Sequence, residues 1–241
     1  LFIGLLLQIS HSAASVVIQK PSFTISLPDG WTEIPQEIFE RIYDELKYQA
    51  PTKELPKYDY GFQLESSQNW MEYPYILVQV NNSSRIPAQQ FKTSQKIDLN
   101  EKIKTANAHS IISNAELGKT YYDEENNIFW VSIQSELANG QTIQAISGLI
   151  PTETGYVQIH AYSSNSTFAS YLPIFRQIIT STAIPPGLVY KSRWLDSNPT
   201  LGNINWQNIT SKAIAGGIIA IIIAFYAGAF RKKKNSKGGK Y

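Results

Sequence analysis

Residues that could carry out catalysis are few in this chain, and their spacing matches no catalytic motif. After the first 14 residues the only histidines are His109 and His160, which are far apart in the sequence. Cysteine is absent, which excludes a thiol nucleophile, and the G-x-S-x-G, H-E-x-x-H and phosphate-loop motifs are absent too. We therefore predict that the protein is not an enzyme. The alternative is an envelope hydrolase whose serine site is assembled from distant positions.

The acidic run Asp123-Glu124-Glu125 is a cluster whose oxygen atoms could suit a calcium ion. Its spacing lacks the alternating ligands and the glycine of an EF-hand loop. A solvated turn between two strands is the preferred interpretation. We expect no metal site and no cofactor.

Two predicted strands, Ile128–Leu137 and Tyr156–Tyr162, offer the best candidate for a binding surface. Side chains alternate between the two faces of a strand, and here one set is apolar while the other mixes aromatic and polar groups, as contact surfaces do. The alternative is that a helix or a long loop covers this mixed face, with His160 as a packed strand residue. The apolar sets are Phe129, Val131 and Ile133, and Val157, Ile159 and Ala161; the predicted binding residues are Trp130, Gln134, Glu136, Gln158, His160 and Tyr162.

The sequence patterns around these residues predict strands and helices that form an α+β domain. Alternation predicts a strand at Ser22–Leu27, followed by a turn at Pro28-Asp29-Gly30. Pro35 opens a helix with an apolar stripe, and Asn139-Gly140 is a strong hairpin signal. Further strands are predicted at Tyr58–Glu65, Tyr75–Asn81, Ala115–Tyr122, Ile128–Leu137, Gln141–Leu149 and Tyr156–Tyr162, and further helices at Pro87–Thr105 and Thr167–Ser181, the last either kinked at Pro173 or beginning near Ser170.

Two segments of this region carry a family resemblance. The segment from Phe23 to Trp31 (FTISLPDGW) is similar to the opening strand and turn of PsbP-like domains, and the segment from Tyr171 to Ser181 (YLPIFRQIITS) is similar to their closing helix. The resemblance covers about residues 22–184. It implies an antiparallel β-sheet sandwiched by helices and a non-enzymatic accessory or binding module. It transfers no catalytic residues.

The two ends of the chain predict export and a membrane anchor. Ala213–Phe230 is an uncharged apolar run that, as a helix, measures roughly 27 Å, close to the thickness of the hydrocarbon core. Arg231-Lys232-Lys233-Lys234 follows it and belongs on the cytoplasmic side. Leu1–Ile9, followed by Ser12-Ala13-Ala14, resembles a secretory signal. These features predict a single pass through the cytoplasmic (inner) membrane, with the domain outside and the C-terminus inside.

Charge supports this division of the chain. The basic tail holds six of the 21 Lys and Arg residues, which leaves 15 against 19 Asp and Glu residues elsewhere. The domain is therefore slightly acidic, and we expect no nucleic-acid partner. The predicted organisation is a signal-peptide-like segment at 1–14, the extracytoplasmic domain at 15–184, a linker at 185–208, a transmembrane helix at 209–230 and a cytoplasmic tail at 231–241.

Small residues recur at every fourth position of the predicted span. Gly216, Ala220, Ala224 and Gly228 form a stripe that would let another helix approach closely; chance recurrence of common residues is the alternative. The expected partners are the bilayer, an envelope protein of unknown identity, and a second transmembrane helix or another copy of the chain. We predict a membrane-anchored binding or assembly module. Proteolytic release of the domain near the span is a further alternative.

Overall fold

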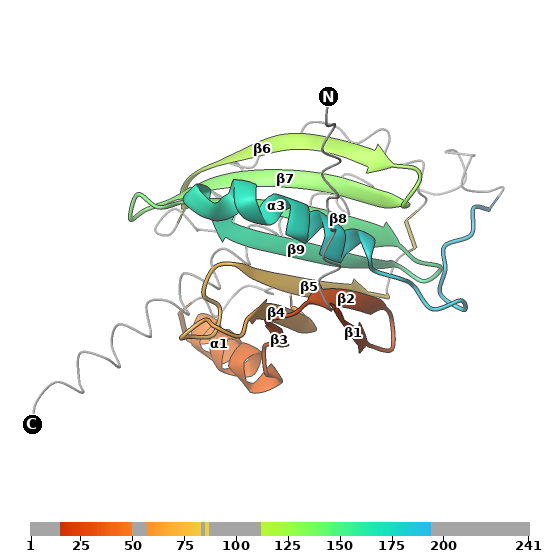
Figure 1. The fold of residues 1–241 in the computed structure, drawn as a ribbon, viewed down its shortest axis with the longest axis horizontal. Coiled ribbons are helices and arrows are strands. Elements are labelled where there is room, and N and C mark those ends of the chain that lie inside the picture. Colours follow the sequence, from red (N-terminus) through yellow and green to blue (C-terminus); the bar gives the residue numbers. More distant parts are fainter. Residues whose placement is uncertain (1–14, 50–56, 83–84, 87–111, 194–241) are drawn as a thin grey trace, which may run out of the picture.

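A computed structural model describes residues 15–49, 57–82, 85–86 and 112–193 of the chain (Figure 1). Within these residues, a seven-stranded antiparallel sheet has the order β3-β4-β5-β9-β8-β7-β6, and a separate ribbon pairs β1 with β2. The elements are β1 (Ser15–Gln19), β2 (Thr24–Pro28), β3 (Trp31–Glu33), α1 (Gln36–Gln49), β4 (Tyr60–Leu64), β5 (Tyr75–Asn81), β6 (Ile112–Asp123), β7 (Ile128–Leu137), β8 (Thr142–Pro151), β9 (Tyr156–Ser164) and α3 (Asn165–Thr180).

Most of these elements were predicted from the sequence. β5 and β7 have the predicted bounds, and α1 begins directly after Pro35. The Asn139-Gly140 turn joins β7 to β8 as predicted, with the Gly140 N–H donating to the Leu137 carbonyl oxygen at 2.8 Å. Gly140 has a φ of +80°, a conformation that glycine adopts at little cost.

The structure also differs from the predictions in places. The short strands β1 and β3 were not predicted. A start of the last helix near Ser170 is wrong: α3 begins at Asn165 and contains Pro173. Pro173 is exposed, so water can bond the carbonyl group that lacks a helical partner. The predicted helix at 87–105, the signal-like segment and the span at 209–230 lie outside the described residues. Within the described part, no helix has the length and apolar character needed to cross a membrane.

Each face of the large sheet packs against one helix. Figure 1 shows α3 lying across β8 and β9, where Phe175 and Ile179 join a cluster that also contains Phe23 and Trp130. α1 contributes Phe39 to a second cluster, on the opposite face. The predicted arrangement of an antiparallel sheet between helices is thus confirmed for the described residues.

Two glycines in the sheet allow the helices to approach this closely. A Cβ atom added at Gly148 would overlap the Ile179 side chain of α3, and one added at Gly61 would lie 2.7 Å from the Phe39 ring of α1. Side chains larger than hydrogen at these positions would push the helices off the sheet.

The sheet has two ends that differ in their contents. The β8–β9 turn (152–155) and the β6–β7 turn (124–127) lie at one end, which we call the Glu153 end. The β7–β8 turn (138–141), the β4–β5 loop (65–74) and the start of α3 lie at the other, the Ser164 end.

Candidate functional site

The predicted binding residues of β7 and β9 lie on opposite faces of the sheet. β8 lies between these strands, and the register aligns Phe129 with Leu149 and Leu149 with Gln158. Residues aligned in this way share a face, so Gln158 lies on the side of Phe129 and not of Trp130. The prediction that the two mixed sets form one surface is wrong. Alternation shows which residues of one strand share a face. It does not show which side of β7 shares a face with which side of β9, because that depends on how both strands pair with β8.

Trp130, Gln134 and Glu136 lie on the face covered by α3. Trp130 is 2% exposed and buried beneath α3, whose Arg176 guanidinium lies 5.0 Å from the indole centroid. Tyr121 stacks on the same indole at 6.4 Å. Gln134 and Glu136 are exposed. Only these two of the six predicted residues reach solvent.

Gln158, His160 and Tyr162 lie on the face covered by α1, and all three are buried. Their burial agrees with the alternative interpretation, in which His160 is a packed strand residue. None of the three can contact a partner in this conformation.

A serine and a histidine lie side by side within this buried face. Ser147 Oγ is 2.7 Å from His160 Nδ1, a separation typical of a nucleophile and its base. However, the side chains are only 3% and 0% exposed, and burial lowers the His160 pKa to about 3. The imidazole is neutral at pH 7, and Nε2 has no hydrogen-bond partner in the described part of the chain. The pair has the spacing of a hydrolytic site without access for a substrate.

Tyrosines surround His160. The Tyr58 ring meets the imidazole edge-on at 6.0 Å, and Tyr162 lies at 6.1 Å. Tyr75 stacks on Tyr162 at 5.1 Å, and Tyr73 stacks on Tyr75 at the same distance. Burial raises the pKa of Tyr75 and of Tyr162, so both phenols stay protonated. This aromatic layer stabilises the middle of the sheet.

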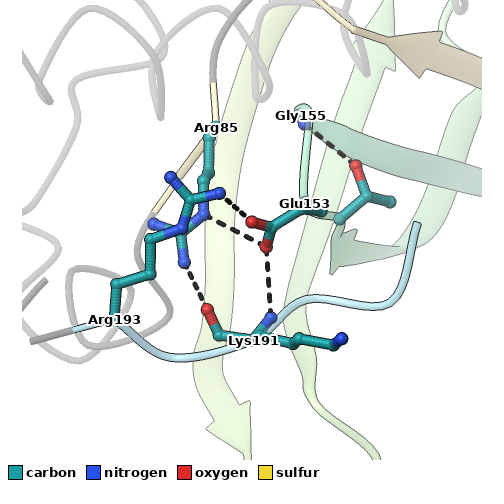
Figure 2. A network of polar contacts seen from close by, with 6 residues as sticks. Arg85, Glu153, Gly155, Lys191 and Arg193 are labelled. Atoms are coloured by element: carbon teal, nitrogen blue, oxygen red, sulfur yellow. Dashed lines mark hydrogen bonds and ion pairs between the residues drawn. The ribbon is translucent and has the colours of Figure 1, made fainter. Parts of the chain in front are cut away.

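Charged groups gather at the Glu153 end (Figure 2). The Glu153 carboxylate lies between two arginines: Arg193 donates to Oε1, and Arg85 Nε lies 3.5 Å from Oε2. The Lys191 N–H donates to Oε2 at 3.4 Å, and Arg85 donates to the Lys191 carbonyl oxygen at 2.5 Å. One carboxylate thus joins three segments that are distant in sequence. We call this set of residues the Glu153 clamp.

The chain that follows α3 lies along the same end. The Glu153 N–H donates to the Leu188 carbonyl oxygen at 2.8 Å, and Thr152 forms an antiparallel bridge with Val189. The Arg85 guanidinium lies 4.5 Å from the Tyr190 ring centroid. The described part of the predicted linker, residues 185–193, is therefore held against the domain. The described part of the chain ends at residue 193, beside the β8–β9 turn.

Sequence reasoning found the β8–β9 turn but missed the clamp. The proline and glycine that border residues 152–154 indicate a turn, whereas the partners of Glu153 come from positions 85 and 193. Charges so far apart have no spacing rule. Paired changes among homologous sequences would be the signal for such a contact.

The Ser164 end carries a pocket of about 480 Å³ between the β4–β5 loop and the first turns of α3. Its walls are rich in hydroxyl and amide groups. Glu72 is the one Asp, Glu, Lys or Arg among the described residues that line it. The lining includes Ser66, Ser67, Gln68, Tyr73, Thr167 and Tyr171.

The loop wall of this pocket is held from beneath by Gln63, which is 2% exposed. Its Nε2 donates to the Asn69 carbonyl oxygen at 2.8 Å, and its Oε1 accepts the Met71 N–H at 2.7 Å. On the helix wall, Ser164 occupies the N-cap position without making a side-chain cap, and its Oγ lies 2.8 Å from Thr167 Oγ1. Both walls are therefore internally bonded.

In the acidic run at the β6–β7 turn, Asp123 accepts hydrogen bonds from the backbone of the turn. Asp123 Oδ1 accepts the N–H groups of Glu125 and Asn126 at 3.1 and 3.2 Å. The hydrogen bond from the Asn126 side chain is the main cause of a lowered Asp123 pKa. Across the described residues, no three His, Asp or Glu side chains are grouped so as to hold a metal ion.

Comparisons with known proteins give similar structures only. No protein-family model matches the chain, and no curated protein sequence matches it. The solution structure of cyanobacterial PsbP (CyanoP) from Synechocystis sp. PCC 6803 is similar, with a TM-score of 0.44 and 11% identity over 72% of this chain and 94% of that one.

Two further structures are similar over the same share of this chain. The Ran-binding protein Mog1p of Saccharomyces cerevisiae has a TM-score of 0.41 at 10% identity, with 96% of that chain covered. LpqN of Mycobacterium tuberculosis, described as involved in cell envelope biogenesis, has a TM-score of 0.35 at 12% identity, with 91% covered. At such identities and TM-scores, these similarities assign no function, partner or site residue to this chain.

Proposed function

We propose that this chain is a membrane-anchored, extracytoplasmic binding or assembly module without enzymatic activity. The observation that carries the proposal is the Glu153 clamp, which holds residues 185–193 against the domain. The domain thus holds the first part of the predicted linker, and residues 194–208 lie between this part and the predicted span at 209–230. A freely swinging tether would need no such contacts.

The clamp also gives the domain a direction. Residues 194–208 separate the clamped segment from the predicted span, and they could reach at most roughly 50 Å when fully extended. Because residue 193 lies at the Glu153 end of the sheet, our proposal puts this end towards the membrane. The Ser164 end, with its pocket, faces away from the membrane and meets other components of the envelope.

The absence of enzymatic activity is supported by the closed serine and histidine pair. Ser147 and His160 are buried in the sheet. A hydrolytic role would require the sheet to open so that a substrate could reach them. For the hydrolase alternative, Ser147 and His160 are suitably close to each other, but a substrate cannot reach them.

The location that we propose is the cytoplasmic (inner) membrane, with the basic tail inside. The stripe Gly216, Ala220, Ala224 and Gly228 lies outside the described residues, and helix association through it stays a prediction. It is independent of the clamp, because a soluble form of the domain would keep the clamp and lose the stripe.

Single cysteines can test the topology because the chain has no cysteine. Exposed positions at both sheet ends, Glu125→Cys and Ala138→Cys, should react with a membrane-impermeant maleimide in intact spheroplasts. Lys237→Cys in the tail should react only after the membrane is opened. In proteoliposomes, a dye on residue 125 should transfer more energy to acceptor lipids than a dye on residue 138.

Three results would contradict the proposal. Protection of both domain cysteines in intact spheroplasts would place the domain inside. Greater energy transfer from residue 138 would reverse the direction of the domain. Recovery of a shortened, labelled domain in the soluble fraction would instead favour proteolytic release.

A further inference from the structure

Charge limits what the pocket at the Ser164 end can bind. No Lys or Arg is present among the described residues that line it, and Glu72 adds a carboxylate. Proteins recognise phosphate and carboxylate groups mainly with Arg and Lys. A negatively charged ligand would meet the Glu72 carboxylate without a compensating Lys or Arg, and among the described lining residues only the N–H groups at the start of α3 supply positive potential. A strongly apolar ligand would leave the serines and the glutamine without partners.

The polar groups of the lining can both donate and accept hydrogen bonds. Ser67 offers a hydroxyl, and Gln68 offers an amide with two donors and an acceptor, whereas the Thr167 hydroxyl is shared with Ser163 and Ser164. Such groups complement a ligand that also carries many hydroxyls. The exposure of Gln68 and Thr167 leaves them accessible from solvent.

Two aromatic rings line the pocket, and both are supported by rings of the core. Tyr73 stacks on Tyr75 with centroids 5.1 Å apart and planes inclined by 25°. Tyr171 stacks on Phe175 at 5.8 Å and 24°. Burial raises the pKa of Tyr73, so its phenol stays neutral. Fixed tyrosine rings give apolar surface for C–H groups and keep a polar edge.

The pocket is also prepared before any ligand arrives. Gln63 fixes the loop wall through Asn69 and Met71, and Tyr171 is fixed within α3. The pocket has a volume of about 480 Å³ and is largely open to solvent, so a ligand could enter without a movement of its walls. Little ordering of the protein is needed on binding, which lowers the entropic cost of binding.

We propose that this pocket binds a neutral, polyhydroxylated ligand of the saccharide class. Hydroxyl and amide groups bond the ligand hydroxyls, and the tyrosine rings pack against the C–H face of a sugar ring. The proposal names the ligand class of the proposed binding module, and it rests on that function only for the direction in which the pocket faces.

Saturation-transfer NMR on the full chain in lipid nanodiscs tests this proposal. The probes are three neutral oligosaccharides, chitotetraose, cellotetraose and maltotetraose, with inorganic phosphate and galacturonic acid as charged counterparts. We expect saturation transfer to the ring protons of at least one neutral oligosaccharide. Tyr171→Ala should weaken its binding about tenfold or more, and Gln68→Ala should weaken it several-fold. Glu125→Gln, at the other end of the sheet, is the matched control and should leave binding unchanged.

The outcomes separate cleanly. Absence of transfer to all three neutral oligosaccharides would overturn the proposal, as would binding that survives both Tyr171→Ala and Gln68→Ala. Stronger binding of the charged probes would overturn it too. Gln68 is exposed, so its variant tests the site even where Tyr171→Ala lowers stability. Cysteine labelling reports on the topology separately, so a pocket without a ligand would leave the anchored module standing.

Discussion

The two ends of the large sheet use polar residues in different ways. At the Glu153 end, Arg85, Glu153 and Arg193 satisfy one another and join distant segments of the chain. At the Ser164 end, hydroxyl and amide groups line a pocket and leave space between two walls. The first end pairs its charged groups across segments, whereas the second bonds its walls internally and leaves groups such as the Gln68 amide exposed to solvent.

This difference separates attachment from recognition. Ionised groups that are paired across segments hold a chain in place, because removing one partner removes the charge-assisted hydrogen bonds that join the segments. Neutral groups that are fixed by their own walls can exchange water for a ligand without rearrangement. Substitutions should therefore affect stability at the Glu153 end and ligand binding at the Ser164 end.

The largest difference is expected between turn glycines of the two ends. A Cβ at Gly155 would overlap the Asn81 carbonyl oxygen, and the backbone there cannot move aside, so Gly155→Ala should cost about 3 kcal/mol or more. Gly140 has open space around it and only its positive φ to lose, so Gly140→Ala should cost about 1 kcal/mol. Urea unfolding of the full chain measures both. Equal losses would remove the contrast between the turns.

Acid should lower the free energy of unfolding through His160, which lies on β9 between the two ends of the sheet. His160 has a folded pKa of about 3, below the unfolded value of 6.5, so its contribution to stability is present above pH 6.5 and is lost as the pH falls. From pH 8 to pH 5 the free energy of unfolding should fall by about 2 kcal/mol. Burial raises the pKa of Asp59, which acts in the opposite direction, so the comparison ends at pH 5.

The control for this pH dependence replaces both members of the buried pair. In Ser147→Ala with His160→Leu, neither partner is left unbonded and the titrating group is gone. Unfolding monitored by circular dichroism should then show a flatter profile between pH 8 and pH 5. An unchanged slope in the double variant would assign the pH dependence to other groups.

Neutralising the clamp should have a smaller and local effect. Glu153→Gln removes the charge between Arg85 and Arg193 and should cost about 1–2 kcal/mol. Hydrogen exchange should rise first in residues 188–193. Glu72→Gln, its counterpart in the pocket lining, should change stability by less than about 0.5 kcal/mol. Equal protection of residues 188–193 in both variants would show that the clamp does not hold this segment.

The smallest effect is expected at the start of α3. Serine at an N-cap typically contributes about 1 kcal/mol, but Ser164 makes no side-chain cap and bonds neighbouring hydroxyls instead. Ser164→Ala should therefore cost less than about 0.5 kcal/mol in thermal unfolding. A loss near 1 kcal/mol would mean that this hydroxyl caps the helix in solution.

Local patterns in the sequence predicted much of the fold. Asn139-Gly140 and the alternation of β7 predicted a hairpin because turn chemistry and side-chain period act within a few residues. β3 escaped because three residues are too few to display a period. α3 can contain Pro173 because this residue is exposed to solvent, and its exposure follows from the packing of the helix on the sheet.

The site residues were harder to predict, for a different reason. Trp130 and Gln158 each lie on the mixed side of their own strand. The register with which β8 pairs to β7 and to β9 puts these two sides on opposite faces of the sheet. The pairing of Glu153 with Arg85 and Arg193 depends on three segments meeting at one edge. Such contacts follow from topology, and topology is set by the whole chain.

The position of β9 beside β5 has a consequence for how the chain folds. β6 to β9 can pair successively through short turns, and β3 to β5 can pair with one another, whereas β5 cannot join β9 until β9, the last of the described strands, has been made. Closing so long an interval costs more chain entropy than closing a hairpin. We therefore expect the four C-terminal strands to assemble first and the early strands to dock onto them. The pairing of β5 with β9 would then form after the local pairings on either side of it.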